Sequence, residues 1–248
     1  MTPVYFHGLP GGAGELALVP GVQIYCPQRP ASGDFAALAD QIAQATKGAE
    51  LHLIGFSAGA QAALRVAALQ ATAELNIGRI DLIAPAAPLE LGDFLPDMAG
   101  RTVFRAARWP MVLAALTAAQ AAALRFAPGA FLAALFASAP VADQQMLAEP
   151  GVRSLLLRVY RDCLYSPQAY RAEVCAYVQP WAHFLAHVTA PVTLWQGDAD
   201  TWAPPAMAEA LTAALPRAEL VELIGMGHYS ALREALPRIL AVDAVADA

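Results

Sequence analysis

Short apolar runs alternate with segments of helical periodicity over most of the chain. The apolar runs predict six β-strands, at residues 3–6, 22–26, 51–54, 80–84, 191–196 and 219–224. Helical spacing of apolar side chains predicts helices at residues 34–46, 58–71 and 231–241, and from residue 204 or 205 to 215. This order indicates βαβ units, and therefore an α/β protein whose mostly parallel sheet of about six strands carries helices on both faces.

The alternation is interrupted between the fourth and fifth predicted strands. Residues 92–179 contain no strand signal, only helical stretches separated by prolines such as Pro110, Pro128 and Pro140. Ser166 followed by Pro167 indicates a helix start, with the serine as N-cap and the proline in the first turn. We therefore expect a core formed by residues 1–91 and 180–248, and an all-helical insertion of four or five helices at residues 92–179.

The hydrophobic content of 58% resembles that of a membrane protein, but much of the excess is alanine, which favours helices more than membrane insertion. The most apolar region, residues 111–139, is interrupted by Thr117, Gln120 and Arg125, so it lacks a run of ~18 apolar residues. The N-terminal residues do not have the pattern of a signal peptide. We therefore expect a soluble, cytoplasmic protein, and the composition disfavours a membrane as its partner. Contact of the alanine-rich, aromatic insertion with a membrane or with a partner protein is a further possibility.

Charge and cysteine content narrow the classes of partner. The formal charge is -6 with 15 lysines and arginines, which disfavours nucleic-acid binding. Cys26, Cys163 and Cys175 are odd in number and form no C-x-x-C motif, which disfavours a disulfide scaffold or a zinc site. His183 and His187 have the spacing of metal ligands but no acidic or cysteine residue close in sequence. We expect neither a metal nor a cofactor, and a small-molecule substrate with an apolar part.

Four polar or glycine-rich turns follow predicted strands directly. One is Gly55-Phe56-Ser57-Ala58-Gly59, which places a serine between a strand and an alanine-rich helix. The others are the loop His7–Gly12, the turn that contains Asp198 and Asp200, and the turn that ends in His228. In a parallel sheet the carboxyl ends of the strands meet at one edge, so these groups are expected to lie together. A serine hydroxyl needs a neighbouring base, and the base needs an orienting acid.

These motifs together resemble those of an α/β-hydrolase with a helical cap, over residues 3–241. The resemblance implies that Ser57 is the nucleophile, His228 the base and Asp200 the acid, since the family spacing Gly-x-x-Asp selects Asp200 over Asp198. It also implies an oxyanion hole made by the backbone N–H groups of Leu9 and Ala58.

One departure from the family concerns the sheet. The family often has two further strands before the glycine-rich loop, whereas here the loop begins at His7. The first two of the usual eight strands are therefore expected to be missing. This leaves an edge strand through which a homodimer could form.

The function implied is that of a serine hydrolase that cleaves a carboxylic ester or lactone through an acyl-enzyme. Carbon–carbon bond hydrolysis, amide or iminopeptide cleavage and perhydrolysis use similar triads, and the motifs do not separate them. A non-catalytic protein that binds a small apolar ligand with the same fold is the alternative from another class. Two further histidines are given structural roles: His7 is expected to brace the oxyanion loop, and His52 to be buried and hydrogen-bonded.

Overall fold

The computed structural model describes residues 1–29 and 33–246, and its centre is a single parallel sheet in the order β1-β2-β3-β4-β5. The strands are β1 (Thr2–Phe6), β2 (Glu50–Phe56), β3 (Asn76–Ile83), β4 (Val192–Gly197) and β5 (Ala218–Leu223). All neighbouring pairs are parallel. The expected α/β architecture is therefore confirmed, with five strands where about six were expected.

The predicted strand at residues 22–26 is wrong. Only Tyr25 pairs with the sheet, through an isolated parallel bridge to Val4 and a hydrogen bond from Tyr5 N to Tyr25 O of 2.9 Å. Pro20 and Gly21 precede this segment and Pro27 follows it, which leaves little regular backbone for a ladder. The bridge nevertheless covers part of the free edge of β1. Dimerisation through this edge stays a prediction, which a dimeric mass in light scattering would support.

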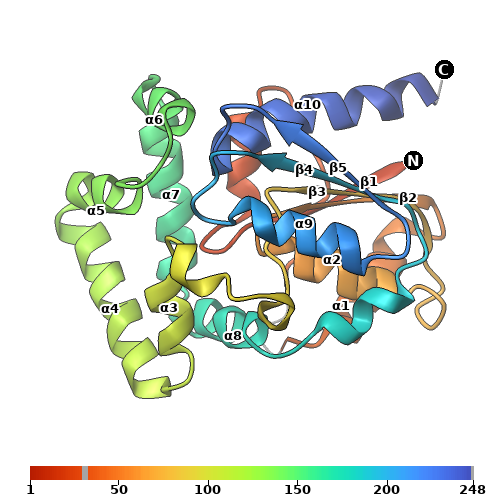
Figure 1. Ribbon diagram of the computed structural model, residues 1–248, viewed down its shortest axis with the longest axis horizontal. Coiled ribbons are helices and arrows are strands. Elements are labelled where there is room, and N and C mark those ends of the chain that lie inside the picture. Colours follow the sequence, from red (N-terminus) through yellow and green to blue (C-terminus); the bar gives the residue numbers. More distant parts are fainter. Residues whose placement is uncertain (30–32, 247–248) are drawn as a thin grey trace.

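Helices cover both faces of the sheet (Figure 1). One face carries α1 (Phe35–Thr46), α2 (Gly59–Ala68) and α9 (Pro205–Ala214), and the other carries α10 (His228–Ala246). The helix α1 begins as the sequence indicates, because the Asp34 side chain accepts a hydrogen bond from Ala37 N at 3.0 Å. The helix α10 begins three residues earlier than predicted, so that His228 lies in its first turn.

Between β3 and β4 the chain forms a group of helices beside the carboxyl ends of the strands (Figure 1). These are α3 (Arg101–Ala106), α4 (Pro110–Phe126), α5 (Pro128–Leu135), α6 (Val141–Ala148), α7 (Val152–Leu164) and α8 (Pro167–Tyr177). There are thus six α-helices rather than four or five in the described residues, because Pro110 separates the short α3 from α4. The domain boundaries given above stay a prediction.

The apolar core has two parts, one on each face of the sheet. The part under α10 continues without interruption into the helical group, where Leu113, Leu124, Leu156 and Tyr160 are fully buried or nearly so. The helical group is therefore packed firmly on the sheet. In the described residues no helix is long and apolar enough to cross a membrane.

Candidate active site

Ser57 lies on a sharp turn between β2 and α2. Its backbone has a φ of 55°, in the left-handed region that non-glycine residues rarely adopt. A Cβ atom on Gly59 would lie 2.0 Å from Phe6 O, so only glycine allows α2 to approach β1 this closely. Ser57 N donates to Ile83 O at 2.9 Å and Ser57 O accepts from Ala86 N at 3.1 Å. The turn is thus clamped to β3 and its end, and the strained serine is held in place.

Asp200 and His228, which are 28 residues apart in sequence, are in direct contact. Asp200 Oδ2 lies 2.7 Å from His228 Nδ1, and both side chains are buried. The second oxygen, Oδ1, accepts hydrogen bonds from the backbone N–H groups of Trp202 at 2.7 Å and Ala203 at 3.1 Å. The competing residue Asp198 instead accepts from Gly225 N at 2.7 Å and holds the turn after β5. Of these two acids, Asp200 is therefore the one that contacts the histidine.

Aromatic rings position the imidazole of His228 on two sides. The ring of Trp202 stacks on it with centroids 5.3 Å apart, and the ring of Phe56, the residue before Ser57, lies at 4.8 Å. This places the histidine next to the serine turn. Within the described residues, the hydrogen bonds found for Ser57 are those of its backbone, so its hydroxyl is available to a substrate or to the base.

Asp143 of α6 is a buried acid that the sequence analysis did not identify. Its Oδ2 accepts from His228 N at 2.9 Å and its Oδ1 accepts from Ser230 N at 2.7 Å. These N–H groups belong to the first turn of α10, where the helix itself supplies no acceptors. A residue of the helical group therefore caps the helix that carries the histidine.

The loop after β1 is braced by a second buried acid, Glu15, in the 3-10 helix Ala13–Leu18. Glu15 Oε1 accepts from Gly8 N at 2.8 Å and from Tyr5 Oη at 2.7 Å. The carbonyl group of the same residue is also held, because Gly8 O accepts from Arg29 Nη2 at 3.1 Å. In the part of the chain that the structure describes, the N–H groups of Leu9 and Ala58 donate to no other backbone group. Both remain available for an oxyanion.

His7 lies among these bracing groups. Its Nδ1 is 2.8 Å from both Gly8 O and Arg29 Nη2. Burial, together with the Arg29 cation, lowers the pKa of His7 to about 3, so the ring is neutral at ordinary pH. The ring therefore contributes contacts and shape to the loop, in agreement with the structural role expected for it.

The candidate nucleophile opens onto a cavity of about 360 Å³ between the sheet and the helical group. Ser57, Leu9 and Ala58 lie in its wall, together with Trp202, which stacks on His228. Half of the other lining residues come from α3, α4 and α5, and six of these are apolar: Val103, Phe104, Leu116, Phe131, Ala134 and Leu135. The cavity thus combines an apolar wall with a few polar groups around Ser57, as is usual for small-molecule sites.

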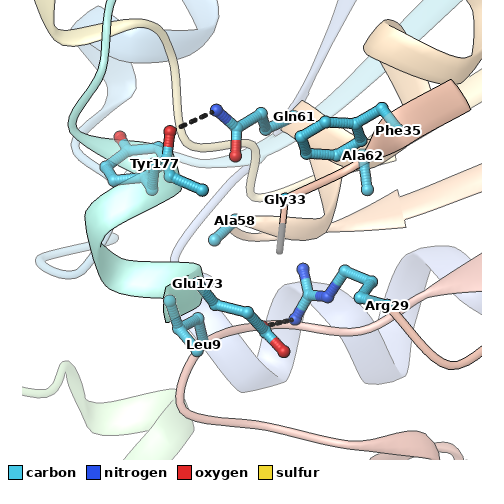
Figure 2. A pocket seen from close by; sticks show the side chains of 10 residues that line it. Leu9, Arg29, Gly33, Phe35, Ala58, Gln61, Ala62, Glu173 and Tyr177 are labelled. Atoms are coloured by element: carbon cyan, nitrogen blue, oxygen red, sulfur yellow. Dashed lines mark hydrogen bonds and ion pairs between the residues drawn. The ribbon is translucent and has the colours of Figure 1, made fainter. Parts of the chain in front are cut away.

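A second cavity, of about 20 Å³, shares Leu9 and Ala58 with the first. In Figure 2 the side chains of Arg29 and Glu173 point toward each other at one end of this cavity, with Arg29 Nη2 2.6 Å from Glu173 Oε2. At the other end Gln61 Nε2 donates to Ala176 O at 3.1 Å (Figure 2). These contacts tie α8 of the helical group to the oxyanion loop and to α2. The volume is enough for about one water molecule.

Glu15→Gln is expected to remove a pH-dependent loss of stability. Burial raises the pKa of the Glu15 carboxyl to about 7. The folded state therefore holds this proton more tightly than the unfolded state does. Its ionisation destabilises the fold as the pH rises from about 4.5 through about 7, by up to ~3 kcal/mol.

The lowered pKa of His7 acts in the opposite sense between about pH 3 and 6.5, because there the unfolded state binds the extra proton. The informative quantity is therefore the difference in unfolding free energy between wild type and Glu15→Gln, measured with urea at about pH 5 and about pH 8. We expect the wild type to lose stability relative to the variant at the higher pH. The same difference at both pH values would contradict an ionising Glu15.

The other histidines lie away from this site. His52 is fully buried on β2, and its Nε2 is 2.7 Å from Asp81 Oδ2, which confirms the expected buried and hydrogen-bonded side chain. The ring of His183 packs on that of Phe184 at 4.1 Å. Among the described residues there is no group of three or more His, Cys, Asp or Glu side chains that could hold a metal ion.

Comparison with known proteins places the chain in a family. A model of the alpha/beta hydrolase family matches residues 4–242. No curated protein matches the chain. A solved esterase from Exiguobacterium antarcticum aligns with a TM-score of 0.63 at 16% identity, over 100% of this chain and 92% of the esterase.

Two further solved structures have the same fold. The enol-lactonase from Burkholderia xenovorans aligns with a TM-score of 0.64 at 18% identity, over 99% of this chain and 91% of its own. The bromoperoxidase from Bacillus anthracis aligns with a TM-score of 0.63 at 16% identity, over 97% of this chain and 92% of the bromoperoxidase. At such low identity the neighbours establish the fold, whereas the family model covers nearly the whole sequence. The chain therefore belongs to the alpha/beta hydrolase family and is an enzyme of the hydrolase class.

Proposed function

We propose that the protein is a serine hydrolase that cleaves a carboxylic ester or lactone through an acyl-enzyme. The observation that carries the proposal is the position of Ser57, on a strained turn in the wall of an apolar cavity and next to the hydrogen-bonded pair of Asp200 and His228. The esterase and the enol-lactonase among the structural neighbours act on bonds of this class by their names. Their similarity supports the choice of reaction but carries no information on the substrate.

In the proposed mechanism Ser57 Oγ attacks the carbonyl carbon of the substrate while His228 Nε2 takes the hydroxyl proton. Asp200 accepts from His228 Nδ1 and stabilises the imidazolium that forms. The negative charge on the carbonyl oxygen is met by the N–H groups of Leu9 and Ala58. Loss of one such donor costs ~3 kcal/mol in comparable sites.

The intermediate collapses by breaking the acyl–oxygen bond, and His228 returns its proton to the alcohol that leaves. Water, deprotonated by the same histidine, then attacks the acyl-enzyme and releases the acid and the serine. Asp143 and Glu15 touch none of the reacting atoms in this scheme. Their contribution is to hold the N-terminus of α10 and the oxyanion loop.

The cavity favours a substrate with an apolar acyl or alcohol part. Its volume of about 360 Å³ suits a small ligand, and its walls offer mainly aliphatic and aromatic side chains. Carbon–carbon, amide and peroxide chemistry on the same triad are the alternatives within this fold.

The proposal is tested by labelling and turnover with the purified protein. A fluorophosphonate is expected to attach one phosphonyl label per chain, at Ser57, with loss of fluoride. A panel of esters, lactones, amides and diketones is expected to show the fastest turnover for an apolar ester or lactone. Stoichiometric binding of apolar ligands without labelling or turnover would contradict the proposed role of Ser57 as nucleophile. Fastest turnover of a diketone or an amide would show that the protein cleaves another class of bond, with Ser57 still as the nucleophile.

A further inference from the structure

The outward side of α4 is apolar, which is unusual for a helix on a protein surface. The exposed positions of this helix are Pro110, Met111, Val112, Ala115, Ala118, Ala119, Ala122, Ala123, Arg125 and Phe126. At 3.6 residues per turn, those from Met111 to Phe126 fall on one side of the helix. Arg125 is the only polar residue among them. An ordinary surface helix presents polar side chains to water on this side.

Neighbouring segments extend the apolar surface. Trp109, directly before α4, is 58% exposed, and at the ends of the helix Met111 is 86% and Phe126 is 79% exposed. On α5 the exposed positions are Gly129, Ala130, Ala133 and Ala134. We call the exposed residues of 109–134 the cap face. Figure 1 shows α4 and α5 at the side of the molecule farthest from the sheet and from both chain termini. Large apolar surfaces of this kind mark sites of association.

The charges in the segment that contains the cap face have one sign. Residues 98–142 contain Arg101, Arg105, Arg108 and Arg125, all exposed, and no acidic residue. This stretch therefore carries a formal charge of +4, and subtracting it from the total of -6 leaves -10 on the rest of the chain. Arg125 lies over the ring of Phe126 at 5.5 Å, so that cation and apolar ring reach the same surface. The cap face is thus an apolar surface bordered by cations on an otherwise acidic protein.

We propose that the cap face docks reversibly on an anionic phospholipid surface. Trp109, Met111, Val112 and Phe126 would enter the boundary between headgroups and acyl chains, and the arginines would contact anionic headgroups. The helix α4 then lies in the plane of the interface, which is consistent with the finding that no described helix can span a membrane.

A second copy of the chain fits this surface less well. In a twofold-symmetric pair each cap face would meet its own image. The four arginines of one copy would then approach the same four of the other, with no acid in residues 98–142 to pair with them. An anionic lipid surface meets both the charge and the apolarity of the cap face.

Docking would also place the substrate cavity beside the lipid. Leu116, Phe131 and Ala134, which line the cavity, belong to α4 and α5, the two helices that form the cap face. If the protein is the proposed ester hydrolase, the expected substrate is an apolar ester that partitions into the lipid. The docking itself does not depend on the reaction.

Sedimentation with sucrose-loaded vesicles tests the docking. Vesicles of phosphatidylcholine with about 30% phosphatidylglycerol are expected to bind the protein at least tenfold more strongly than phosphatidylcholine alone, and about 0.5 M salt is expected to weaken the binding. The variant Met111→Ser/Val112→Ser/Phe126→Ser should lose at least tenfold in partition. Arg105→Gln/Arg108→Gln should lose the preference for anionic vesicles.

Controls separate this proposal from the hydrolase mechanism. Ile224→Ser and Arg217→Gln change an exposed apolar side chain and an exposed cation outside the cap face, and both should bind vesicles as the wild type does. Turnover of a short, water-soluble ester should be unchanged in the triple serine variant, because its three positions do not line the cavity. Vesicle binding should persist in Ser57→Ala even if no substrate is turned over.

Three results would overturn the docking. They are equal binding to neutral and anionic vesicles, no binding to either, and unchanged binding of the triple serine variant. A dimeric mass that the triple serine variant abolishes would instead assign the cap face to contact between copies of the chain.

Discussion

Ser57→Ala is expected to lower the rate of ester hydrolysis at least ~1000-fold, because no other group can then form the acyl-enzyme. The residual rate would come from the oxyanion donors and from binding in the cavity. The fold should survive the change, since alanine keeps the Cβ atom and Ser57 makes its hydrogen bonds through its backbone. The measurement is kcat/KM on a chromogenic ester, together with the urea midpoint of both proteins.

Ser154→Ala is the matched control for this variant, because Ser154 is exposed on α7 and distant in sequence from the turn. It should retain wild-type turnover. Ester hydrolysis by Ser57→Ala at a rate close to the wild type would exclude Ser57 as the nucleophile. A loss of rate accompanied by unfolding would be resolved by repeating the assay on the folded fraction, where the loss should persist.

The sheet and the serine turn could be predicted because their signals are local. The apolar run at residues 51–54 lies inside β2, and the run at residues 191–196 overlaps β4 except at its first residue. The glycines around Ser57 mark the turn between β2 and α2. The G-x-S-x-G pattern already implies a glycine at position 59, and the structure gives the steric reason: a Cβ atom there would collide with Phe6 O. The segment at residues 22–26 has the same kind of apolar signal but makes only one bridge. Strand formation depends on a partner as well as on composition.

The residues that hold the site in shape could not be predicted in the same way. Glu15 is a single acid in a glycine-rich and apolar stretch, and its hydrogen bond to Gly8 N exists only once the loop folds back on itself. Asp143 is 85 residues from His228 in sequence, and nothing in the pattern of α6 distinguishes it from an exposed acid. A buried acid is recognisable from sequence only when its partners are nearby. Here the partners are backbone groups of another element.

The pairing of Asp143 with α10 also shows how the helical group and the sheet form one active site. The histidine turn follows β5, yet its backbone is capped by α6, and a Cβ atom on Gly227 would lie 2.6 Å from Asp143 Oδ2. On the other side of the cavity, Arg29 links the oxyanion loop to Glu173 of α8. The helical group therefore supports both the base and the oxyanion loop, in addition to forming the cavity wall.

Asp143→Ala is expected to destabilise the protein by ~2–6 kcal/mol and to lower kcat more than it changes KM. The variant leaves the N–H groups of His228 and Ser230 buried without an acceptor, and each such group costs ~1–3 kcal/mol. The first turn of α10 then loosens, and the imidazole of His228 spends less time aligned with Ser57. Substrate binding is affected less, because Asp143 does not line the cavity.

Two further variants, Asp143→Asn and Asp162→Ala, serve as controls for Asp143→Ala. Asparagine keeps one acceptor oxygen at the same position, so it should recover part of the stability and part of kcat, whereas Asp162 is an exposed acid on α7 whose loss should change neither. Urea unfolding gives the stability, and steady-state kinetics at a temperature where every variant is folded gives the kcat and KM values. If Asp143→Ala lost stability but kept its kcat in the folded state, the acid would serve the fold alone. A selective fall in kcat that asparagine partly restores requires instead that α6 controls the position of the base.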